Sequence, residues 1–374
     1  MGASANGVYR NSSRRARFVA LFNDLGAGAV STYARGLGAA TFTRATVAWT
    51  KLSTGLWAEV ASGTARSGYL GATTAVGAYG GYFVEAAGTQ LVTPTASIRD
   101  MTDASWVKVT MTAAKNATGI DGVASSATTL TATGATATIL QTLVAAASSR
   151  TYSCFMRRKT GTGTILIAQG ATTEDVTSQL NSTTYTKVDL NASVLNAAFG
   201  IQINTSGDEV EVDFNQFEAG AVATSPMASA GAARNADALT YPTSGNVSGT
   251  AGTLYAEIVY LAPLCVIAQL NTAGNSVIGY GTGFGTHDGT AIVNVAGGIT
   301  AGNSIQKGGG SWGGSTMTSF LSGVVTSGAF DGDMNVSVNF SVGSWSGNYL
   351  VGFLKNVHIW THTLSEAAQQ AMST

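Results

Sequence analysis

The stretch that decides the fold is EVEVDFNQFEAGAVATSPMASAGAARNADALTY, residues 209–241. Its first six residues alternate between acidic and apolar side chains, which predicts a half-buried β-strand. The alternation separates two faces of that strand, with Glu209, Glu211 and Asp213 toward solvent and Val210, Val212 and Phe214 toward a core. Small residues and Pro226 follow the strand, and they predict a boundary between two modules.

Composition sets the limits of what the chain can do. The 374 residues suggest two or three domains. Charged residues make up only 10% of the chain, against about 25% in ordinary soluble domains. The net charge of −1 gives no general attraction to nucleic acid or to an anionic membrane. No stretch approaches the roughly 20 apolar residues of a membrane span, so no membrane insertion is expected.

The two cysteines also carry little functional information. Cys154 and Cys265 lie far apart in apolar, strand-like runs. Two cysteines are too few for a disulfide framework or a structural zinc site. Both are therefore predicted to be small buried side chains.

The spacing of turn signals predicts an all-β chain in three parts. Residues 1–100 contain short runs punctuated by glycine, which cannot bury a core alone, and they predict an extended N-terminal arm. Residues 101–222 contain about seven short strands, which are typical of a sandwich or jelly roll. Residues 235–374 predict a second sandwich that ends in a strand and a short helix. On this division, a chain that begins near Met101 should fold without the arm.

The final strand carries two further expectations. The end of the chain, a strand of residues 353–360 followed by Leu364 and Ser365, is similar to the end of laminin-G or concanavalin A-like sandwiches. The resemblance implies that this strand lies next to the strand of residues 254–260, and Ser365 is expected to cap the following helix with its hydroxyl. Strict alternation predicts two opposite faces, Phe353, Lys355, Val357 and Ile359 on one and Leu354, Asn356, His358 and Trp360 on the other.

Short motifs in a fixed order give the chain a family resemblance. The 209–241 stretch contains "E-x-G" at Glu218, "A-T-S/P" at residues 223–226 and "R-x-A-D" at residues 234–237. Earlier pieces occur in the same order as in that family: "F-T-R-A" at residues 42–45, "G-x-W" at 55–57, "A-R" at 65–66, a glutamate at 85 and "T-Q-L" at 89–91, where Gln90 stands for a usual Asn. In these motifs the chain resembles virion structural proteins of tailed bacteriophages.

The resemblance implies a fold and a role. Residues 101–222 resemble a carbohydrate-binding-module-like jelly roll, and residues 235–374 resemble a laminin-G or concanavalin A-like sandwich. It implies a fibre or decoration protein of the virion, assembled in the cytoplasm of a bacterial host, with the N-terminal arm as its attachment. The implied partners are other virion proteins, two further copies in a homotrimer and a glycan of the host surface. Head and tail locations both stay open.

Candidate site residues follow from the resemblance and from residue chemistry. Aromatic rings in glycine- and serine-rich loops are platforms on which a sugar ring can stack, and Trp312, Trp345 and Tyr349 are the candidates. Four basic residues, Arg10, Arg14, Arg15 and Arg17, are the candidates for virion attachment. Asp331 and Asp333 are candidate ligands for a structural calcium ion; no other cofactor is expected.

No catalytic motif competes with this interpretation, and the chain is predicted not to be an enzyme. Glu209, Glu211 and Asp213 share one face of a strand, about 6.6–6.8 Å apart per pair, but their spacing does not match a glycosidase pattern. Two alternatives remain: a polysaccharide depolymerase of the tailspike type that uses Glu211 and Asp213, and a purely structural head-fibre or decoration protein without a ligand.

Overall fold

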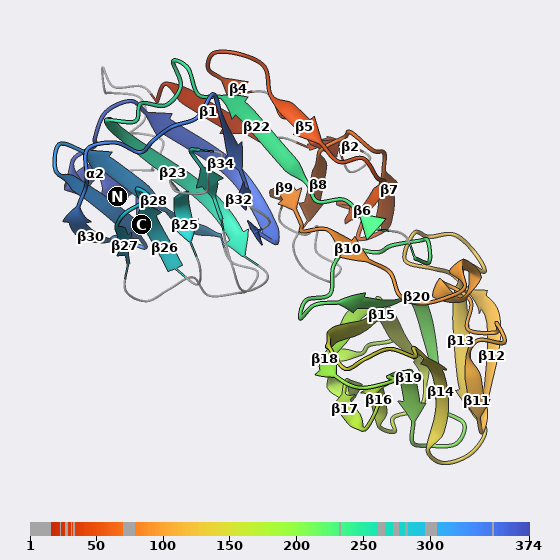
Figure 1. Ribbon diagram of the computed structural model, residues 1–374. Coiled ribbons are helices and arrows are strands. Elements are labelled where there is room, and N and C mark those ends of the chain that lie inside the picture. Colours follow the sequence, from red (N-terminus) through yellow and green to blue (C-terminus); the bar gives the residue numbers. More distant parts are fainter. Residues whose placement is uncertain are drawn as a thin grey trace, which may run out of the picture.

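The computed structural model describes residues 16–22, 24–26, 29–30, 32, 34–69, 79–231, 233–260, 266–271, 277–280, 283–295, 305–345 and 348–374. These residues form two β-sandwich lobes, a larger one and a smaller one, which confirms the predicted all-β class (Figure 1). Besides strands, they contain the 3-10 turns η1 (Thr95–Ile98) and η2 (Thr177–Gln179) and the helix α2 (Glu366–Ser373). None of these helical segments is long and apolar enough to cross a membrane.

The first sheet of the larger lobe mixes strands from both ends of the chain. Within the described residues it has 11 strands. They are β1 (Phe18–Leu21), β2 (Asp24–Gly26), β3 (Ala29–Val30), β4 (Ala34–Arg35), β8 (Arg66–Tyr69), β9 (Tyr79–Val84), β23 (Ala251–Tyr260), β28 (Gln306–Gly313), β29 (Thr316–Leu321), β30 (Val324–Ala329) and β34 (Gly352–Trp360). The order is β2-β3-β8-β9-β34-β23-β28-β29-β30, with β1 paired to β34 and β4.

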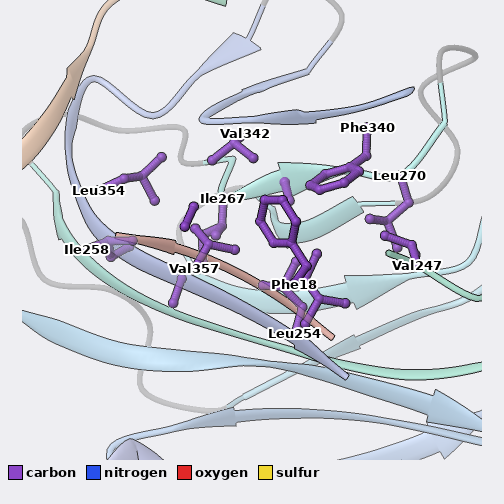
Figure 2. Close-up of a cluster of buried hydrophobic side chains, with 14 of the residues drawn as sticks. Phe18, Val247, Leu254, Ile258, Ile267, Leu270, Phe340, Val342, Leu354 and Val357 are labelled. Atoms are coloured by element: carbon purple, nitrogen blue, oxygen red, sulfur yellow. The ribbon is translucent and has the colours of Figure 1, made fainter. Parts of the chain in front are cut away.

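The second sheet of the larger lobe faces the first across a hydrophobic core. Its seven described strands follow the order β27-β26-β25-β24-β31-β22-β5. They are β5 (Thr41–Thr43), β22 (Ala238–Pro242), β24 (Ala268–Gln269), β25 (Val277–Tyr280), β26 (Gly283–His287), β27 (Ile292–Asn294) and β31 (Asn339–Val342). After β31 the chain forms a separate two-stranded antiparallel pair of β32 (Ser344–Trp345) and β33 (Asn348–Tyr349). Figure 2 shows side chains of the core, among them Phe18, Leu254 and Val357.

The first hundred residues are extended, as expected, but they do not form a separate arm. Phe18 of β1 pairs with Ile359 of β34, and Phe83 of β9 pairs with Phe353 of the same strand. Because the short N-terminal strands cannot bury a core alone, they complete the sheets of the larger lobe instead. The prediction of a separate arm over residues 1–100 is therefore corrected, and a chain that starts near Met101 would lack strands of both sheets of the larger lobe.

The closing strand β34 pairs with β23 as predicted, but its faces differ from strict alternation. Glu257 pairs with Asn356, whereas the next residue, Ile258, pairs with Leu354, so Lys355 is an extra residue in a β-bulge. The bulge shifts the phase of the strand and places Leu354, Val357 and Ile359 together in the core. The predicted division into two alternating faces is therefore wrong.

Ser365 does occupy the N-cap position of α2, although its role differs from the expected one. The hydroxyl makes no capping hydrogen bond, and the backbone carbonyl oxygen of Ser365 accepts from the N–H groups of Ala368 and Gln369. The helix packs Leu364 and Met372 against the outer face of the first sheet in a small satellite core.

The smaller lobe is a jelly roll of two five-stranded sheets around one core. One sheet contains β11 (Val107–Val109), β14 (Ala137–Thr142), β16 (Ile165–Gln169), β17 (Thr172–Asp175) and β19 (Ala198–Ile203). The other contains β12 (Met111–Ala117), β13 (Ala127–Ala132), β15 (Ser149–Thr160), β18 (Thr186–Ser193) and β20 (Glu209–Ala219). Val210, Val212 and Phe214 enter the core, as predicted. Cys154 is also buried there, and Cys265 lies outside the described residues.

The jelly roll is an insertion within the larger lobe. The chain leaves the larger lobe through β10 (Gly88–Thr89) and returns through β21 (Ala233–Arg234), and these two strands pair side by side. A hairpin of β6 (Ala48–Lys51) and β7 (Trp57–Val60) comes from the N-terminal segment. It packs onto the jelly roll through Trp49, whose ring centroid lies 4.8 Å from that of Phe214. The two lobes are thus joined by two adjacent chain crossings and by a docked hairpin (Figure 1).

Candidate functional site

The motif residues that give the chain its family resemblance meet in one place, at the junction of the two lobes. Six side chains form what we call the junction network: Arg44, Arg66, Glu85, Ser225, Arg234 and Asp237. They come from five short motifs that lie as far apart as 193 residues in sequence. The order of the motifs along the chain therefore corresponds to a single three-dimensional cluster.

Asp237 bridges two guanidinium groups at the centre of the network. Its Oδ1 accepts from Arg44 Nη1 at 2.8 Å, and its Oδ2 accepts from Arg66 Nη2. The backbone N–H of Glu85 also donates to Oδ2 at 3.1 Å, and the Asp237 N–H donates back to the Glu85 carbonyl oxygen at 3.1 Å. One carboxylate thus ties the start of β22 to β9 and to the β5–β6 turn.

Glu85 makes the second centre. Its carboxylate accepts from Arg234 Nη1 at 2.5 Å and lies 3.0 Å from Arg66 Nη1. It also accepts from the backbone N–H of Ser225 at 2.7 Å and from the Ser225 hydroxyl at 2.6 Å. Ser225 belongs to the linker that leaves the jelly roll, so Glu85 holds the linker against the larger lobe.

The network is buried and carries an excess positive charge. Its five charged residues, the three arginines with Asp237 and Glu85, are each at most 2% exposed. Three guanidinium groups face two carboxylates, and backbone carbonyl oxygens accept most of the remaining donors. Arg44 donates to Ala61 O at 2.7 Å, Arg66 to Trp49 O at 2.8 Å and Arg234 to Ala86 O at 2.5 Å. Buried charges persist only where such partners compensate their lost hydration.

A second group of hydrogen bonds locks the linker to the jelly roll itself. Glu218 accepts from the N–H of Thr224 at 2.5 Å and from its hydroxyl at 2.8 Å. Gln90 accepts from the N–H of Phe217 at 3.0 Å and donates to the Met227 carbonyl oxygen at 3.3 Å. The long side chain at position 90, where Asn is usual in the resembling family, thereby connects both chain crossings.

Stability should depend on pH through Glu85. Burial alone would raise the pKa of Glu85, but Arg234, Arg66 and the Ser225 hydroxyl lower it from 4.5 to about 2. A depressed folded-state pKa contributes stability that is present above pH 4.5 and is lost as the pH falls through about 2. The shift in the pKa of Glu85 corresponds to a contribution of about 3 kcal/mol to the free energy of unfolding at neutral pH.

The test compares urea unfolding of the wild type and Glu85→Gln between pH 7 and pH 2. We expect the gap in unfolding free energy between them to shrink by about 3 kcal/mol over this range. Glu174→Gln, which changes an exposed carboxylate on β17, is the matched control and should show a constant gap. A gap for Glu85→Gln that stays constant with pH would contradict the assignment.

The structure places the predicted sugar platforms differently from the sequence expectation. Trp312, expected at the surface, is 0% exposed, because it lies in β28 with its ring packed on Gly252 and its Nε1 donating to Ser248 O at 2.9 Å. Trp312 is therefore a core residue, and its assignment as a platform is wrong. Tyr349 is half-buried against the core of the larger lobe, and the side chain of Trp345 lies outside the described residues.

The predicted attachment residues are described only in part. Arg10, Arg14 and Arg15 lie outside the described residues. Arg17 is exposed, but its Nε donates to the Gly245 carbonyl oxygen of the larger lobe at 2.9 Å. Its role in attachment stays a prediction.

The predicted calcium ligands lie in an exposed turn. Asp331 accepts from the Thr290 hydroxyl at 3.1 Å, and Asp333 accepts from the Asn335 N–H at 2.9 Å. Among the described residues, no group of three or more His, Cys, Asp or Glu side chains could hold a metal ion. Calcium binding by Asp331 and Asp333 stays a prediction without a described third ligand.

The first three carboxylates of β20 are each engaged with a cation. Glu209 lies 3.3 Å from Lys159 Nζ, and Glu211 pairs with Arg157. Asp213 is not solvated, as alternation predicts, but fully buried in a two-pronged pair with Arg99 at 2.7 and 2.8 Å. The segment around Ile120 also covers this carboxylate, because the Ile120 N–H donates to Asp213 Oδ2 at 2.9 Å.

The comparisons with known proteins give only distant likenesses. No family model and no curated protein matches the chain. Among solved structures, it is similar to domain 4 of AbnA, a GH43 extracellular arabinanase from Geobacillus stearothermophilus in complex with arabinotriose, at 13% identity and a TM-score of 0.32, over 37% of this chain and 73% of that one. It is also similar to the N-terminal CBM22-1-CBM22-2 tandem domain of Paenibacillus barcinonensis Xyn10C, at 10% identity and a TM-score of 0.26, over 74% and 99%. Likenesses at this distance do not bear on function.

Proposed function

We propose that this protein is a non-enzymatic structural component of a phage particle, which displays two sandwich lobes in a fixed arrangement for contact with a glycan of the host surface. The junction network is the observation that carries the proposal. Its residues are the ones that make up the motifs shared with virion structural proteins, and they link the lobes to each other. A protein that displays surfaces on a particle needs such a rigid connection more than it needs a catalytic cleft.

Three features of the junction support a rigid display role. The two chain crossings pair as β10 and β21, the linker is held at Ser225 and Thr224, and the β6–β7 hairpin docks across the lobes. Charge-assisted hydrogen bonds of this kind fix orientation strongly when they are buried. Attachment to the particle then falls to other residues, among which Arg10, Arg14, Arg15 and Arg17 remain the candidates.

The engaged carboxylates of β20 support the non-enzymatic part of the proposal. A glycosidase needs one carboxyl group free to donate a proton and another free to act as base or nucleophile. Glu211 and Asp213 are instead paired with Arg157 and Arg99. The purified protein should therefore release no reducing ends from host-surface polysaccharide; release that Glu211→Gln or Asp213→Asn abolishes would contradict this.

The proposed location is tested on particles purified by density gradient from the bacterium that carries the gene. Mass spectrometry should find the protein in the particle fraction, and immunogold labelling should decorate one part of the particle. The label would also decide between head and tail. A protein recovered only in the soluble lysate, and absent from the purified particles, would overturn the proposal.

A further inference from the structure

One surface of the molecule combines exposed aromatic edges with paired polar groups, and both lobes' sequences contribute to it. We call it the aromatic–polar strip and define it by six residues: Trp57, Asn116, Thr129, Arg157, Tyr185 and Glu211. Trp57 belongs to the docked hairpin, and the others belong to the jelly roll. The side chains of Trp57 and Tyr185 are half-buried, and Asn116 is exposed.

The polar part of the strip is a row across one sheet of the jelly roll. Arg157 of β15 pairs in register with Glu211 of β20, and Glu211 pairs in register with Thr129 of β13. The Thr129 hydroxyl donates to Asn116 Oδ1 on β12 at 2.7 Å. Directly paired residues lie on the same face of a sheet. At about 4.8 Å per strand, the row from Tyr185 to Asn116 spans about 19 Å.

The aromatic part lies at one end of this row. The Cζ atom of Arg157 lies 4.6 Å from the centroid of the Tyr185 ring. The Tyr185 hydroxyl donates to the Thr118 carbonyl oxygen at 2.9 Å. The Trp57 ring packs edge-on against the Phe155 ring, with 5.2 Å between the ring centroids. The backbone N–H of Trp57 donates to the Ile120 carbonyl oxygen at 2.9 Å. Phe155 and Arg157 are two residues apart on β15, which places the two rings side by side along one face.

We propose that the aromatic–polar strip binds a neutral oligosaccharide, an inference that rests on the proposed function and gives it a location. The apolar face of a sugar ring stacks on an aromatic ring. The hydroxyl groups of the sugar form hydrogen bonds with protein donors and acceptors that are held in place. Here the rings are fixed by the 118–120 segment. The side-chain amide of Asn116 can donate a hydrogen bond to a sugar hydroxyl, and the carboxylate of Glu211 can accept one from a sugar hydroxyl.

Charge decides which class of glycan fits. Arg157 and Glu211 neutralise each other by pairing, so the row offers donors and acceptors without a net charge. A carboxylated or sulfated glycan would gain no attraction from such a row and would meet the Glu211 carboxylate. The strip therefore favours a neutral chain of a few sugar units over an acidic one.

The experiment uses the full chain, fluorescently labelled, on a printed array of neutral and acidic bacterial surface polysaccharides. We expect dose-dependent binding to neutral polysaccharides, weakened at least tenfold by Trp57→Ala and by Tyr185→Ala. Asn116→Ala, at an exposed position, keeps the test valid if the aromatic variants unfold, and it should also weaken binding. Phe42→Ala, at a half-buried aromatic of the larger lobe, is the matched control and should bind as the wild type does.

The outcomes separate the strip from the general function. The strip would be overturned, with glycan display left standing, if wild-type binding survives Asn116→Ala and both aromatic variants. Loss of binding in Phe42→Ala would have the same consequence. Equal binding to acidic polysaccharides would overturn the neutral class of ligand. No binding of the wild type to any spot on the array would overturn both the strip and the glycan-contact part of the proposed function.

Discussion

A chain shortened to begin at Glu85 is expected not to fold its larger lobe. The deletion removes β1, β8 and β9 from the sheet beside β34, and with them the buried side chains of Phe18, Phe22 and Tyr82. Loss of one large core side chain costs about 3–5 kcal/mol. The combined loss exceeds the roughly 5–15 kcal/mol that holds a domain together. Urea unfolding followed by tryptophan fluorescence should show no cooperative transition of the larger lobe.

A separate polypeptide of residues 1–84, produced in the same cell, is the control for this deletion. If the missing strands are the cause, the two pieces should associate and restore the cooperative transition. A shortened chain that unfolds cooperatively alone, with dispersed amide resonances for residues 239–360, would show that the N-terminal strands are an appended arm after all.

The second large effect is expected from Asp237→Ala in the junction network. The substitution leaves the guanidinium groups of Arg44 and Arg66 buried without their shared carboxylate. Removal of one partner from a buried ion pair costs about 3–5 kcal/mol, because the remaining charge is uncompensated. The unfolding free energy in urea should fall by that amount, and elastase, which cuts after small residues, should cut the alanine-rich linker of residues 219–233 faster.

The matched control is a carboxylate at the surface. Glu209 pairs with Lys159, whose side chain is 40% exposed, and Glu209→Ala should cost about 1 kcal/mol or less. Equal effects of the two substitutions would mean that the junction network does not hold the lobes together.

The all-β class could be predicted because alternation is local to each strand. The pairing of β23 with β34 was expected only from the resemblance to laminin-G or concanavalin A-like sandwiches. The residues of the junction network could be singled out by their order but not assigned a role. Arg44 and Asp237 are separated by 193 residues, and no local pattern shows that such residues meet. From the sequence, Arg44 was therefore placed only in the F-T-R-A motif of the extended segment of residues 1–100.

Two predictions of exposed side chains were wrong for the same physical reason: segments distant in sequence bury these side chains. Trp312 looked exposed because glycine and serine surround it, yet glycine at position 252 is what lets the indole pack flat in the core. Asp213 looked solvated because it alternates with valines, yet Arg99 and the segment around Ile120 cover it. The aromatics Trp57 and Tyr185 were not proposed, because nothing near them in sequence shows that both lie against the segment of residues 118–120.

The insertion of the jelly roll also sets the order of events during synthesis. The larger lobe needs β9, which ends at residue 84, and β34, which ends at residue 360, so 276 residues must be made between them. At roughly 5–20 residues per second, the N-terminal strands wait about 14–55 s for their partners. In that interval the jelly roll can fold and bring Ser225 and Arg234 back toward Glu85. The ribosome thus releases a chain whose first strands are the last to be covered, and a chaperone that shields Phe18 and Phe22 would act in that window.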